Sequence, residues 1–300
     1  YDMVAEGCDA GDLELMFAPA LECVASVIRQ FIRLPDGPML DADYSAIEAR
    51  IAAWIAGQND RLELFRKGGD IYTHSAKSVD VNASRQFGKV LELAFGYQGG
   101  DGAWASACGM FNMEYKKQEG EKFKNAWRET NSEIAGFWYK LQNAAIKAIK
   151  APGEWVKVND KIKIGCGKYA GMQYLVIELP SKRKLMYPKP RLEQGKYGPQ
   201  IAYWGKETGK AFFGTVKLYG GKIFENLCQG IAYDLMAYGA LSAEKAGYNI
   251  FALIHDQALA PKGEGQTPEA FAEALSSLPS WAEGMPLTAD ADEMNYYTKT

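Results

Sequence analysis

The sequence has few of the residues that build disulfide frameworks or transition-metal sites. The 300-residue chain holds five cysteines, which form no CxxC pair and are odd in number, and only two histidines, His74 and His255. These counts argue against a disulfide-stapled fold and against zinc sites built from cysteine or histidine. We therefore expect reduced, mostly buried thiols in a cytoplasmic protein, and any metal should be a hard cation held by carboxylates.

Long apolar runs are missing as well. No stretch of 18 apolar residues occurs, and the first 14 residues carry five acids and no base. These features argue against a membrane span and a signal peptide. With 47% hydrophobic and 24% charged residues, the composition is close to that of packed soluble domains, and 300 residues suffice for one large domain or two modest ones.

The chain also lacks an excess of positive charge. Because 34 Lys and Arg face 37 Asp and Glu, the net charge of −3 argues at face value against a nucleic-acid partner. The charges are unevenly distributed, however, since residues 182–217 hold nine bases and two acids, a local charge of +7. A solvated surface would account for such a run. The rings within it would equally suit a groove for a phosphate backbone and stacked bases, and they are Tyr187, Tyr197, Tyr203, Trp204 and Phe212.

Periodicity and turn signals predict a mixture of helices and strands. We expect a strand over 37–44, followed by a helix that Ser45 caps and Gly57 ends. Further helices are expected over 84–97, 120–149 and 222–246. The pieces YLVIEL and TVKLYGG favour β structure, and NIFALIHDQALAP is typical of two short strands around a polar tip. An α+β or α/β fold follows.

Two carboxylates lie at the ends of these expected elements. Asp43 lies where the strand in LDADYSAIEAR gives way to a helix, and His255 and Asp256 interrupt the apolar hairpin IFALIHDQALA. An isolated Asp at the first position would favour a helix-entry cap. Because a buried carboxylate is costly unless it is paired or metal-bound, two such acids on neighbouring strand ends would instead form a site for divalent metal. Two ions held there could stabilise the attacking and leaving oxygens of a phosphoryl transfer.

A second group of residues suits a triphosphate. Arg85 and Lys89 are four residues apart and share a face of a predicted helix, near the end where the macrodipole disfavours bases. Tyr97 falls roughly 80° further round this helix, beside the same groove. The structural alternative is a basic, solvated helix face with a core tyrosine, but cations at this end of a helix suit phosphates.

In this order, the three segments resemble the signatures of the family A DNA polymerases, the DNA polymerase I-like group, and especially of their phage-encoded members. Residues 43–50 match DYSxIExR, residues 85–97 match RxxxKxxxxxxxY, and His255-Asp256 match the HD of HDE. The resemblance extends from about residue 20 to residue 300.

The resemblance implies a template-directed DNA polymerase that adds dNMP to a primer 3′-OH and releases pyrophosphate. It implies that Asp43, Asp256 and the backbone carbonyl of Tyr44 bind two Mg²⁺ ions, for which Mn²⁺ could substitute, and that Lys89 can protonate the departing pyrophosphate. Residues implied to bind the incoming dNTP are Arg85 and Lys89 at the triphosphate, Glu48 under the sugar where it excludes a 2′-hydroxyl, Tyr97 at the nascent base pair, and Leu93 and Tyr72. Those implied to contact primer and template are Gln229 in the minor groove, His255 at the primer terminus, Arg29 and Gln257.

The resemblance also implies an organisation and a set of partners. The fold would be an α+β palm with a small antiparallel sheet, into which a mainly helical fingers subdomain is inserted. We expect a first palm segment over 1–58, fingers over 59–165, and a second palm segment over 166–300 whose basic stretch 182–217 lies along the duplex. The partners would be primed DNA template, dNTPs and an unknown processivity factor, with no membrane, in the cytoplasm of a bacterial host.

The chain departs from the family pattern at several positions. Gln257 stands where the family usually has Glu, so we expect weakened or altered metal use rather than inactivity. Leu93 replaces an aromatic residue that senses the 3′ position of the sugar. Asp41 should share a strand face with Asp43 and could contact metal, although a solvated or capping role is favoured. Nothing before residue 20 resembles a thumb or a proofreading exonuclease, so we expect either a fragment or a protein whose DNA-holding function lies elsewhere.

Two other functions compete with the polymerase. One is a catalytically impaired relic of the same fold that binds primed DNA or serves as a replication scaffold, which Gln257 and the missing thumb favour. The other is a carboxylate-dependent nuclease, which lacks a third and a fourth clustered acid. The intact set Asp43, Arg85, Lys89 and Asp256 favours the enzyme.

Overall fold

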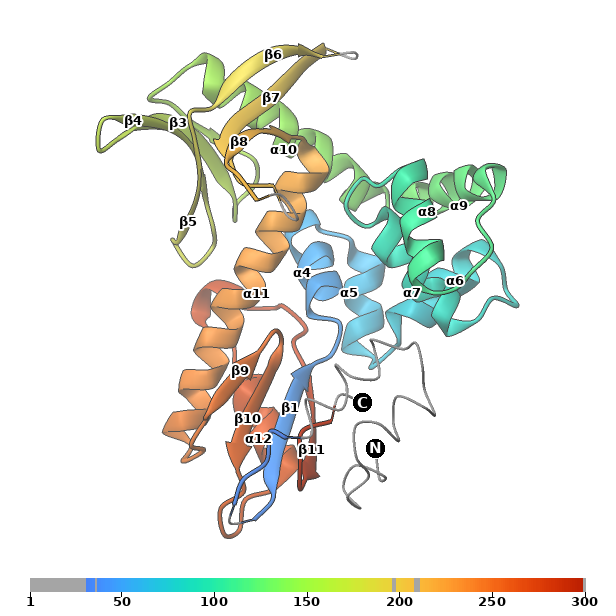
Figure 1. Ribbon diagram of the computed structural model, residues 1–300, viewed down its shortest axis with the longest axis vertical. Helices are drawn as coiled ribbons and strands as arrows, with labels where there is room; N and C mark the ends of the chain where they lie inside the picture. The colour runs from blue at the N-terminus through green and yellow to red at the C-terminus, as the bar shows by residue number, and fades with distance from the viewer. Residues whose placement is uncertain (1–30, 36, 196–197, 208–210, 299–300) are drawn as a thin grey trace. The chain divides into compact units, whose positions relative to one another are not determined.

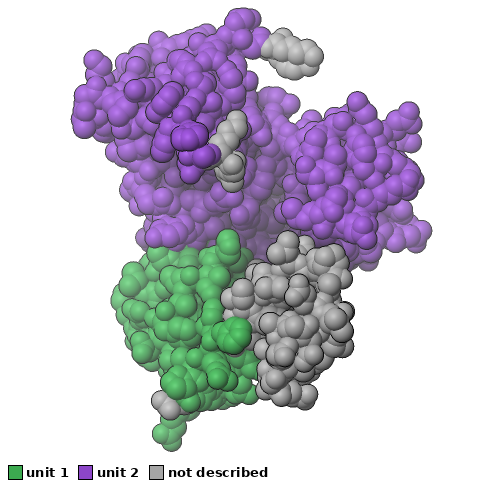
Figure 2. Space-filling model, in the orientation of Figure 1, with its two compact units in different colours: residues 1–45, 235–279, 287–300 green, residues 46–234, 280–286 purple. Residues whose placement is uncertain are grey.

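The fold is known from a computed structural model, which describes residues 31–35, 37–195, 198–207 and 211–298 (Figure 1). The chain divides into two compact units, coloured separately in Figure 2. The first unit comprises residues 1–45, 235–279 and 287–300, and the second unit comprises residues 46–234 and 280–286. These boundaries differ from those of the three expected segments, whose identification as palm and fingers stays a prediction.

The first unit is built on a four-stranded antiparallel sheet in the order β11-β1-β10-β9. The strands are β1 (Met39–Tyr44), β9 (Ala252–Ile254), β10 (Gln257–Pro261) and β11 (Ala289–Met294). Helix α12 (Pro268–Leu275) packs against β1 and β11. The strand expected over 37–44 and the hairpin expected in NIFALIHDQALAP are thus confirmed, and the hairpin lies beside β1 although some 210 residues separate the two in the chain.

The two faces of β1 have different partners because successive side chains point to opposite sides of a sheet. The phenolic hydroxyl of buried Tyr44 donates to the backbone carbonyl of Leu275 in α12 at 2.6 Å. Burial raises the pKa of this phenol. A Cβ on Gly239 would lie 2.3 Å from the same hydroxyl, so this glycine leaves the space that Tyr44 fills. By alternation, Asp41 and Asp43 lie on the face opposite Tyr44.

The second unit begins with helices. They are α4 (Ile47–Ala56), α5 (Asn59–Arg66), α6 (Ile71–Val79), α7 (Arg85–Phe95), α8 (Asp101–Met110), α9 (Lys117–Thr130) and α10 (Ser132–Lys150). Three buried tryptophans fill their core, Trp104, Trp127 and Trp138, and the last two stack with ring centres 6.0 Å apart. The 3-10 turn η1 (Ser280–Ala282) also belongs to this unit.

The ends of α4 are partly as expected. Gly57 ends the helix in a left-handed conformation, with φ 79°, as its position predicts. The predicted cap at Ser45 is wrong, because the N-cap residue is Ala46, with φ 49°. The Ser45 N–H instead donates to the carbonyl of Thr288, which extends the pairing of β1 with the chain that leads into β11.

The helical structure expected over 120–149 is confirmed, but it is divided between two helices, α9 and α10, which meet at Asn131. The side-chain carbonyl of Gln58 accepts hydrogen bonds from the N–H groups of Glu133 and Ile134. These are first-turn donors that a helix start leaves without intrahelical partners, so Gln58 stabilises a new start at this point.

Two antiparallel sheets follow in the second unit, in the orders β2-β3-β4-β5 and β6-β7-β8. Their strands are β2 (Trp155–Lys157), β3 (Lys163–Tyr169), β4 (Met172–Glu178), β5 (Lys184–Pro188), β6 (Arg191–Gly195), β7 (Gly198–Gly205) and β8 (Gly214–Leu218). The β structure predicted for YLVIEL and TVKLYGG is therefore confirmed in β4 and β8.

Helix α11 (Gly220–Lys245) confirms the helix expected over 222–246. Its residues up to Asp234 belong to the second unit, and those from Leu235 onward belong to the first. The combination of helices with antiparallel sheets confirms the α+β class. In the part of the chain that the structure describes, no helix is both long and apolar enough to cross a membrane.

Candidate active site

The two predicted metal-binding acids lie on adjacent strands of the first unit. Asp43 in β1 is directly opposite Gln257, the first residue of β10. The N–H of Tyr44 donates to the backbone carbonyl of Asp256 at 3.0 Å. This hydrogen bond fixes the end of β1 against the turn that carries Asp256. The sheet therefore brings together two acids that are 213 positions apart in the chain, and both are partly buried.

The turn that carries Asp256 has an uncommon backbone. His255 and Asp256 form a two-residue connection between Ile254 and Gln257, which pair with each other. His255 has φ 57°, a left-handed conformation that usually falls to glycine or asparagine in such turns. Holding another residue there costs about 1–3 kcal/mol, and such positions cluster at functional sites. The turn keeps the His255 side chain exposed beside the acid.

The oxygen donors of this sheet edge fit a magnesium ion in type. Among the described residues, no group of three or more His, Cys, Asp or Glu side chains is placed to hold a metal. Mg²⁺ does not need one, because proteins bind it through one or two carboxylates together with substrate phosphates and water. Asp43, Asp256 and a backbone carbonyl are such a set.

An acid that the sequence did not single out lies next to this pair. Asp290 in β11 is directly opposite Asp43 on the other side of β1, and it is exposed. Asp292 is opposite Asp41 in the same way. The signal was present in ADADEM, whose alternation is typical of a strand with acids on one face, but register with β1 cannot be read from sequence.

Gln257 and Asp41 are linked inside the sheet face. Gln257 is 2% exposed and its amide Nε2 donates to Asp41 Oδ2 at 3.2 Å, while the hydroxyl of Tyr297 donates to Gln257 Oε1. Asp41 is 6% exposed. The favoured interpretation of Asp41 as solvated or capping is therefore wrong, because it is a buried hydrogen-bond partner. The predicted role of Gln257 at the primer or template stays a prediction.

In the second unit, the start of α7 presents the predicted cations. The side-chain oxygen of Ser84 accepts from the N–H of Phe87 and caps the helix. Arg85, the first helical residue, pairs with Asp70 at 2.9 Å and lies over the ring of Tyr72 at 4.9 Å. Burial alone would raise the pKa of Asp70, but hydrogen bonds from Thr73 and Arg85 lower it below its ordinary value.

Lys89 and Leu93 continue this face at intervals of four residues. The Lys89 ammonium lies 5.9 Å from the ring centre of Phe111, and among the described residues it forms no ion pair. Leu93 is 52% exposed. The predicted common face for Arg85 and Lys89 is thus present, with Leu93 on it, while the opposite face of α7 is buried.

A buried ion pair that sequence reasoning missed holds α7 in place. Arg61 in α5 forms two hydrogen bonds to Glu92, at 2.9 and 2.6 Å. Glu92 also accepts from Ser75 and from the indole N–H of Trp127 at 2.8 Å. The pair therefore ties α7 to α5, α6 and α9. No local motif marks such contacts.

Glu48 and Tyr97 meet in the second unit. The hydroxyl of Tyr97 donates to a Glu48 carboxylate oxygen, and its ring lies 6.0 Å from that of Phe224. Burial, followed by the nearby Cys228 and Glu48, raises the pKa of Tyr97. The predicted helical position of Tyr97 is wrong, because α7 ends at Phe95 and Tyr97 lies in the turn that follows.

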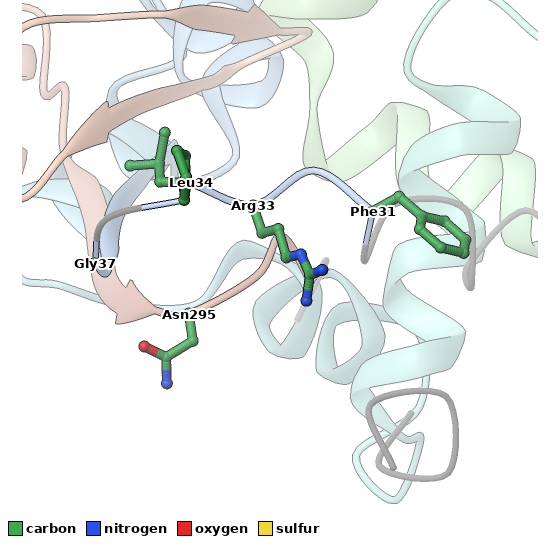
Figure 3. Close-up of a pocket in the computed structure, with 6 residues that line it drawn as sticks. Phe31, Arg33, Leu34, Gly37 and Asn295 are labelled. Carbon is green, nitrogen blue, oxygen red and sulfur yellow. The ribbon is translucent and has the colours of Figure 1, made fainter. Parts of the chain in front are cut away.

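The remaining predicted DNA contacts have less structural context. Gln229 is exposed on α11, next to buried Cys228. Arg29 lies outside the described residues. A pocket in the first unit involves other residues, namely Phe31, Arg33, Leu34, Pro35, Gly37 and Asn295 (Figure 3). None of these six is a predicted site residue, so the pocket adds nothing to the candidate site.

The aromatic residues of the basic stretch 182–217 differ in how far the fold buries them. Tyr187 is buried, and Tyr203 packs against it edge to face with ring centres 5.1 Å apart. Trp204 is 43% exposed and Phe212 is 85% exposed, whereas Tyr197 lies outside the described residues. Of the rings expected to stack with bases, the described ones that face solvent are thus Trp204 and Phe212.

Comparison with known proteins relates the chain to DNA polymerases. No protein-family model matches it. It is 37% identical over 303 residues to a DNA polymerase of Bacillus phage SP02, which covers 96% of this chain and 45% of that protein. A DNA polymerase of Mycobacterium phage L5 is 34% identical over 84 residues, 28% of this chain and 14% of that protein. The chain thus spans less than half the length of these relatives.

A solved structure shows the same fold. The POL domain of Pol1 from M. smegmatis, in complex with DNA primer-template and dNTP, matches with a TM-score of 0.57. The match covers 94% of this chain and 44% of that one at 14% sequence identity. At this identity the likeness concerns the fold.

Proposed function

We propose that this chain, a family A-like relative of the phage-encoded DNA polymerases, carries the nucleotidyl-transfer site of a template-directed DNA polymerase. The observation that carries the proposal is the pairing of β1 with the β9–β10 turn, where the Tyr44 N–H binds the Asp256 carbonyl. This pairing supports the proposal because it puts the backbones of Asp43 and Asp256 at adjacent strand ends. The reaction would add dNMP to a primer 3′-OH and release pyrophosphate.

Asp43, Asp256 and the Tyr44 carbonyl would hold two Mg²⁺ ions, or Mn²⁺ in their place. Bound metal would stabilise negative charge on the attacking and leaving oxygens. The sheet supplies the rigidity that this task requires, because each acid is fixed by backbone pairing rather than by a free loop. The strained His255 keeps its ring at the same turn, where it would support the primer terminus.

The cations of α7 would hold the incoming nucleotide. Arg85 would bind the triphosphate and Lys89 would protonate the departing pyrophosphate from Nζ, while Leu93 and Tyr72 would border the nucleotide. The Asp70 carboxylate and the Tyr72 ring hold the Arg85 guanidinium beside α6. Such preorganised charge is the main way that proteins accelerate phosphoryl transfer.

The other residues would select the sugar and position the DNA. Glu48, held by the Tyr97 hydroxyl, would exclude a 2′-hydroxyl, and the Tyr97 ring would stack at the nascent base pair. Those proposed to contact primer and template are Gln229, His255, Arg29 and Gln257. The partners are therefore primed DNA and dNTPs, and the cytoplasm of a bacterial host stays the expected location.

Primer extension with Mg²⁺ and dNTPs tests the proposal. Asp43→Ala and Asp256→Ala should each abolish extension, while binding of primed DNA, measured by fluorescence anisotropy, should persist. The matched control is Asp160→Ala, which removes a carboxylate from an exposed ion pair with Lys157. This control should extend primers as the parent does.

Two results would overturn the proposal. If the parent binds primed DNA but extends nothing with Mg²⁺ or Mn²⁺, the chain is a DNA-binding scaffold. If both Asp variants extend as well as the parent, the reaction occurs elsewhere and the assignment of the acids is wrong.

A further inference from the structure

The sheet β6-β7-β8 has one face that gathers charge around a tryptophan. Strand register places Arg191, Ala202 and Lys217 in one row and Trp204 opposite Thr215 in the next. Because side chains two residues apart share a face, these residues lie on the same side of the sheet. Trp204 is 43% exposed there.

The other face of this sheet is occupied by protein. It carries Ile201 and Leu218, each 1% exposed, and Tyr203, whose ring packs against Tyr187 of β5. This face therefore contributes buried apolar side chains to the core of the second unit. On the side with Trp204 the indole is 43% exposed, and Phe212 and Phe213, directly before β8, are exposed as well. A group of exposed apolar side chains, unlike a single one, often marks an interaction site.

Three cations share this face with the indole. The Lys189 ammonium lies 5.8 Å from the centre of the Trp204 ring. Arg191 donates to the Thr215 hydroxyl at 2.8 Å, and both Arg191 and Lys217 pair with Glu193. The Glu193 carboxylate thus neutralises one of the two charges of Arg191 and Lys217. With the charge of Lys189, the four residues together carry a net charge of +2.

Cations next to an exposed ring can bind a polyanion whose own aromatic rings are unstacked, such as the bases of a single nucleic-acid strand. Arg191 and Lys217 are 42% and 52% exposed in their side chains, so phosphates can reach them. Two more rings border the same end of the sheet, since Phe212 and Phe213 are 85% and 66% exposed directly before β8. Base stacking on such rings together with phosphate contacts is how proteins bind single strands without sequence preference.

We propose that this face, defined by Lys189, Arg191, Trp204 and Lys217, binds an unpaired DNA strand. The indole stacks on a base, and the three cations contact neighbouring phosphates. Duplex DNA fits less well, because its bases stack on one another and present no free face to an indole. The inference deepens the proposed function, on which it rests, by naming the unpaired template strand as the ligand of this sheet.

Direct binding tests this inference separately from catalysis. The probe is fluorescein-labelled oligodeoxythymidine of about 20 nucleotides, long enough to cover one such binding face. Fluorescence anisotropy should show that Trp204→Ala binds it about tenfold more weakly than the parent, whereas Trp204→Phe keeps most of the affinity. Lys189→Ala should lower the slope of log affinity against log salt by about 0.7, the value for one phosphate contact.

A matched tryptophan provides the control. Trp155 in β2 is 42% exposed and also lies under a lysine, Lys163, at 4.8 Å. That lysine is paired with Glu178, so its charge is already neutralised by a carboxylate. Trp155→Ala should bind the oligonucleotide as the parent does. Circular dichroism and Tm of the Trp204 variants should match the parent, because the lost side chain is at the surface.

The inference is overturned if Trp204→Ala binds the oligonucleotide as tightly as the parent, or if Trp155→Ala weakens binding equally. It is also overturned if Trp204→Ala weakens binding of a blunt duplex to the same degree, which would indicate a duplex contact. Failure of primer extension by the parent would count against the proposed function but would leave these binding results interpretable.

Discussion

Gln257 in β10 is a buried amide that links Asp41 to Tyr297. As a departure from the usual Glu, it suggests a loss of negative charge beside the metals. In the fold it is buried, and its amide donates to Asp41 while it accepts from Tyr297. An amide can do both, whereas a carboxylate can only accept. Asp41 and Gln257 therefore form a matched pair.

We predict that Gln257→Glu lowers stability and extension rather than raising them. A second carboxylate would face that of Asp41 in a buried position, and the hydrogen bond between them would be lost, at a cost of about 1–3 kcal/mol. The measurements are the free energy of unfolding in urea and the rate of primer extension.

The double variant Asp41→Asn/Gln257→Glu provides the control. It exchanges amide and carboxylate, so the hydrogen bonds to position 41 and to Tyr297 can form again. Recovery of most of the stability is expected. A single Gln257→Glu variant that is as stable as the parent and extends faster would show that the missing charge matters more than the pairing.

The Glu48 carboxylate is also held by a neighbouring side chain, since it accepts a hydrogen bond from the Tyr97 hydroxyl. Glu48→Ala should raise the relative use of ribonucleotides by about tenfold, which corresponds to about 1.4 kcal/mol of lost discrimination. The measurement is the ratio of kcat/KM for dNTP and rNTP. Tyr97→Phe keeps the ring and removes the hydroxyl, so it should shift the ratio in the same direction by less. If the kcat/KM ratio is unchanged in Glu48→Ala, this residue does not select the sugar.

At the scale of elements, the position of α7 depends on how closely it approaches α6. A Cβ on Gly88 would lie 1.7 Å from the backbone oxygen of Tyr72. Only glycine allows this approach. The contact sets the distance between the ring of Tyr72 and Arg85, and hence where the cations of α7 lie.

We predict that Gly88→Ala separates α6 from α7, lowers the free energy of unfolding by about 1–3 kcal/mol and raises the KM for dNTP. The control is Gly102→Ala in α8, where an added Cβ meets nothing within 4 Å. That change should be neutral or stabilising, by up to about 1 kcal/mol. Equal effects of the two changes on KM would show that the packing of α7 does not set nucleotide binding.

At the scale of the molecule, the buried ion pair of Arg61 with Glu92 links four helices of the second unit, α5, α6, α7 and α9. Burial by itself would raise the pKa of Glu92, but Arg61, with hydrogen bonds from Ser75 and Trp127, holds it below its ordinary value. A carboxyl with a lowered folded-state pKa stabilises the fold above its unfolded-state pKa. This contribution is lost as pH falls through the folded value.

We therefore predict that the free energy of unfolding falls as pH decreases below about 4.5, the ordinary value for Glu. Glu92→Gln should cost about 3–5 kcal/mol at neutral pH, because it leaves Arg61 buried without a counter-charge, and should flatten the acid dependence. Urea unfolding between neutral and acid pH measures both effects. Asp160→Asn should change the curve little, because its ion pair with Lys157 is exposed and screened by solvent. An acid dependence that persists in Glu92→Gln would show that other groups cause it.

Much of the local structure follows from sequence because it depends on near neighbours. The strand before Asp43, the stop at Gly57 and the hairpin around His255 are set by alternation, by turn residues and by apolar runs. The order of the three signature segments was equally readable, and with it the kinship to polymerases. The cap wrongly predicted at Ser45 and the break at Asn131 that was not predicted have the same kind of cause. In each case a residue far along the chain, Thr288 or Gln58, supplies the hydrogen bond, and no local pattern reveals it.

What only the tertiary structure decided is which of these residues meet. The net charge of −3 could not show that Lys189, Arg191 and Lys217 share one sheet face with an exposed indole. It could not show either that Asp290 lies opposite Asp43. Both depend on strand register, which is set by pairing between segments far apart in the chain. The sequence therefore determined which chemically active residues this chain carries. The fold determined which of them are neighbours, because those contacts form between elements that are far apart in the chain.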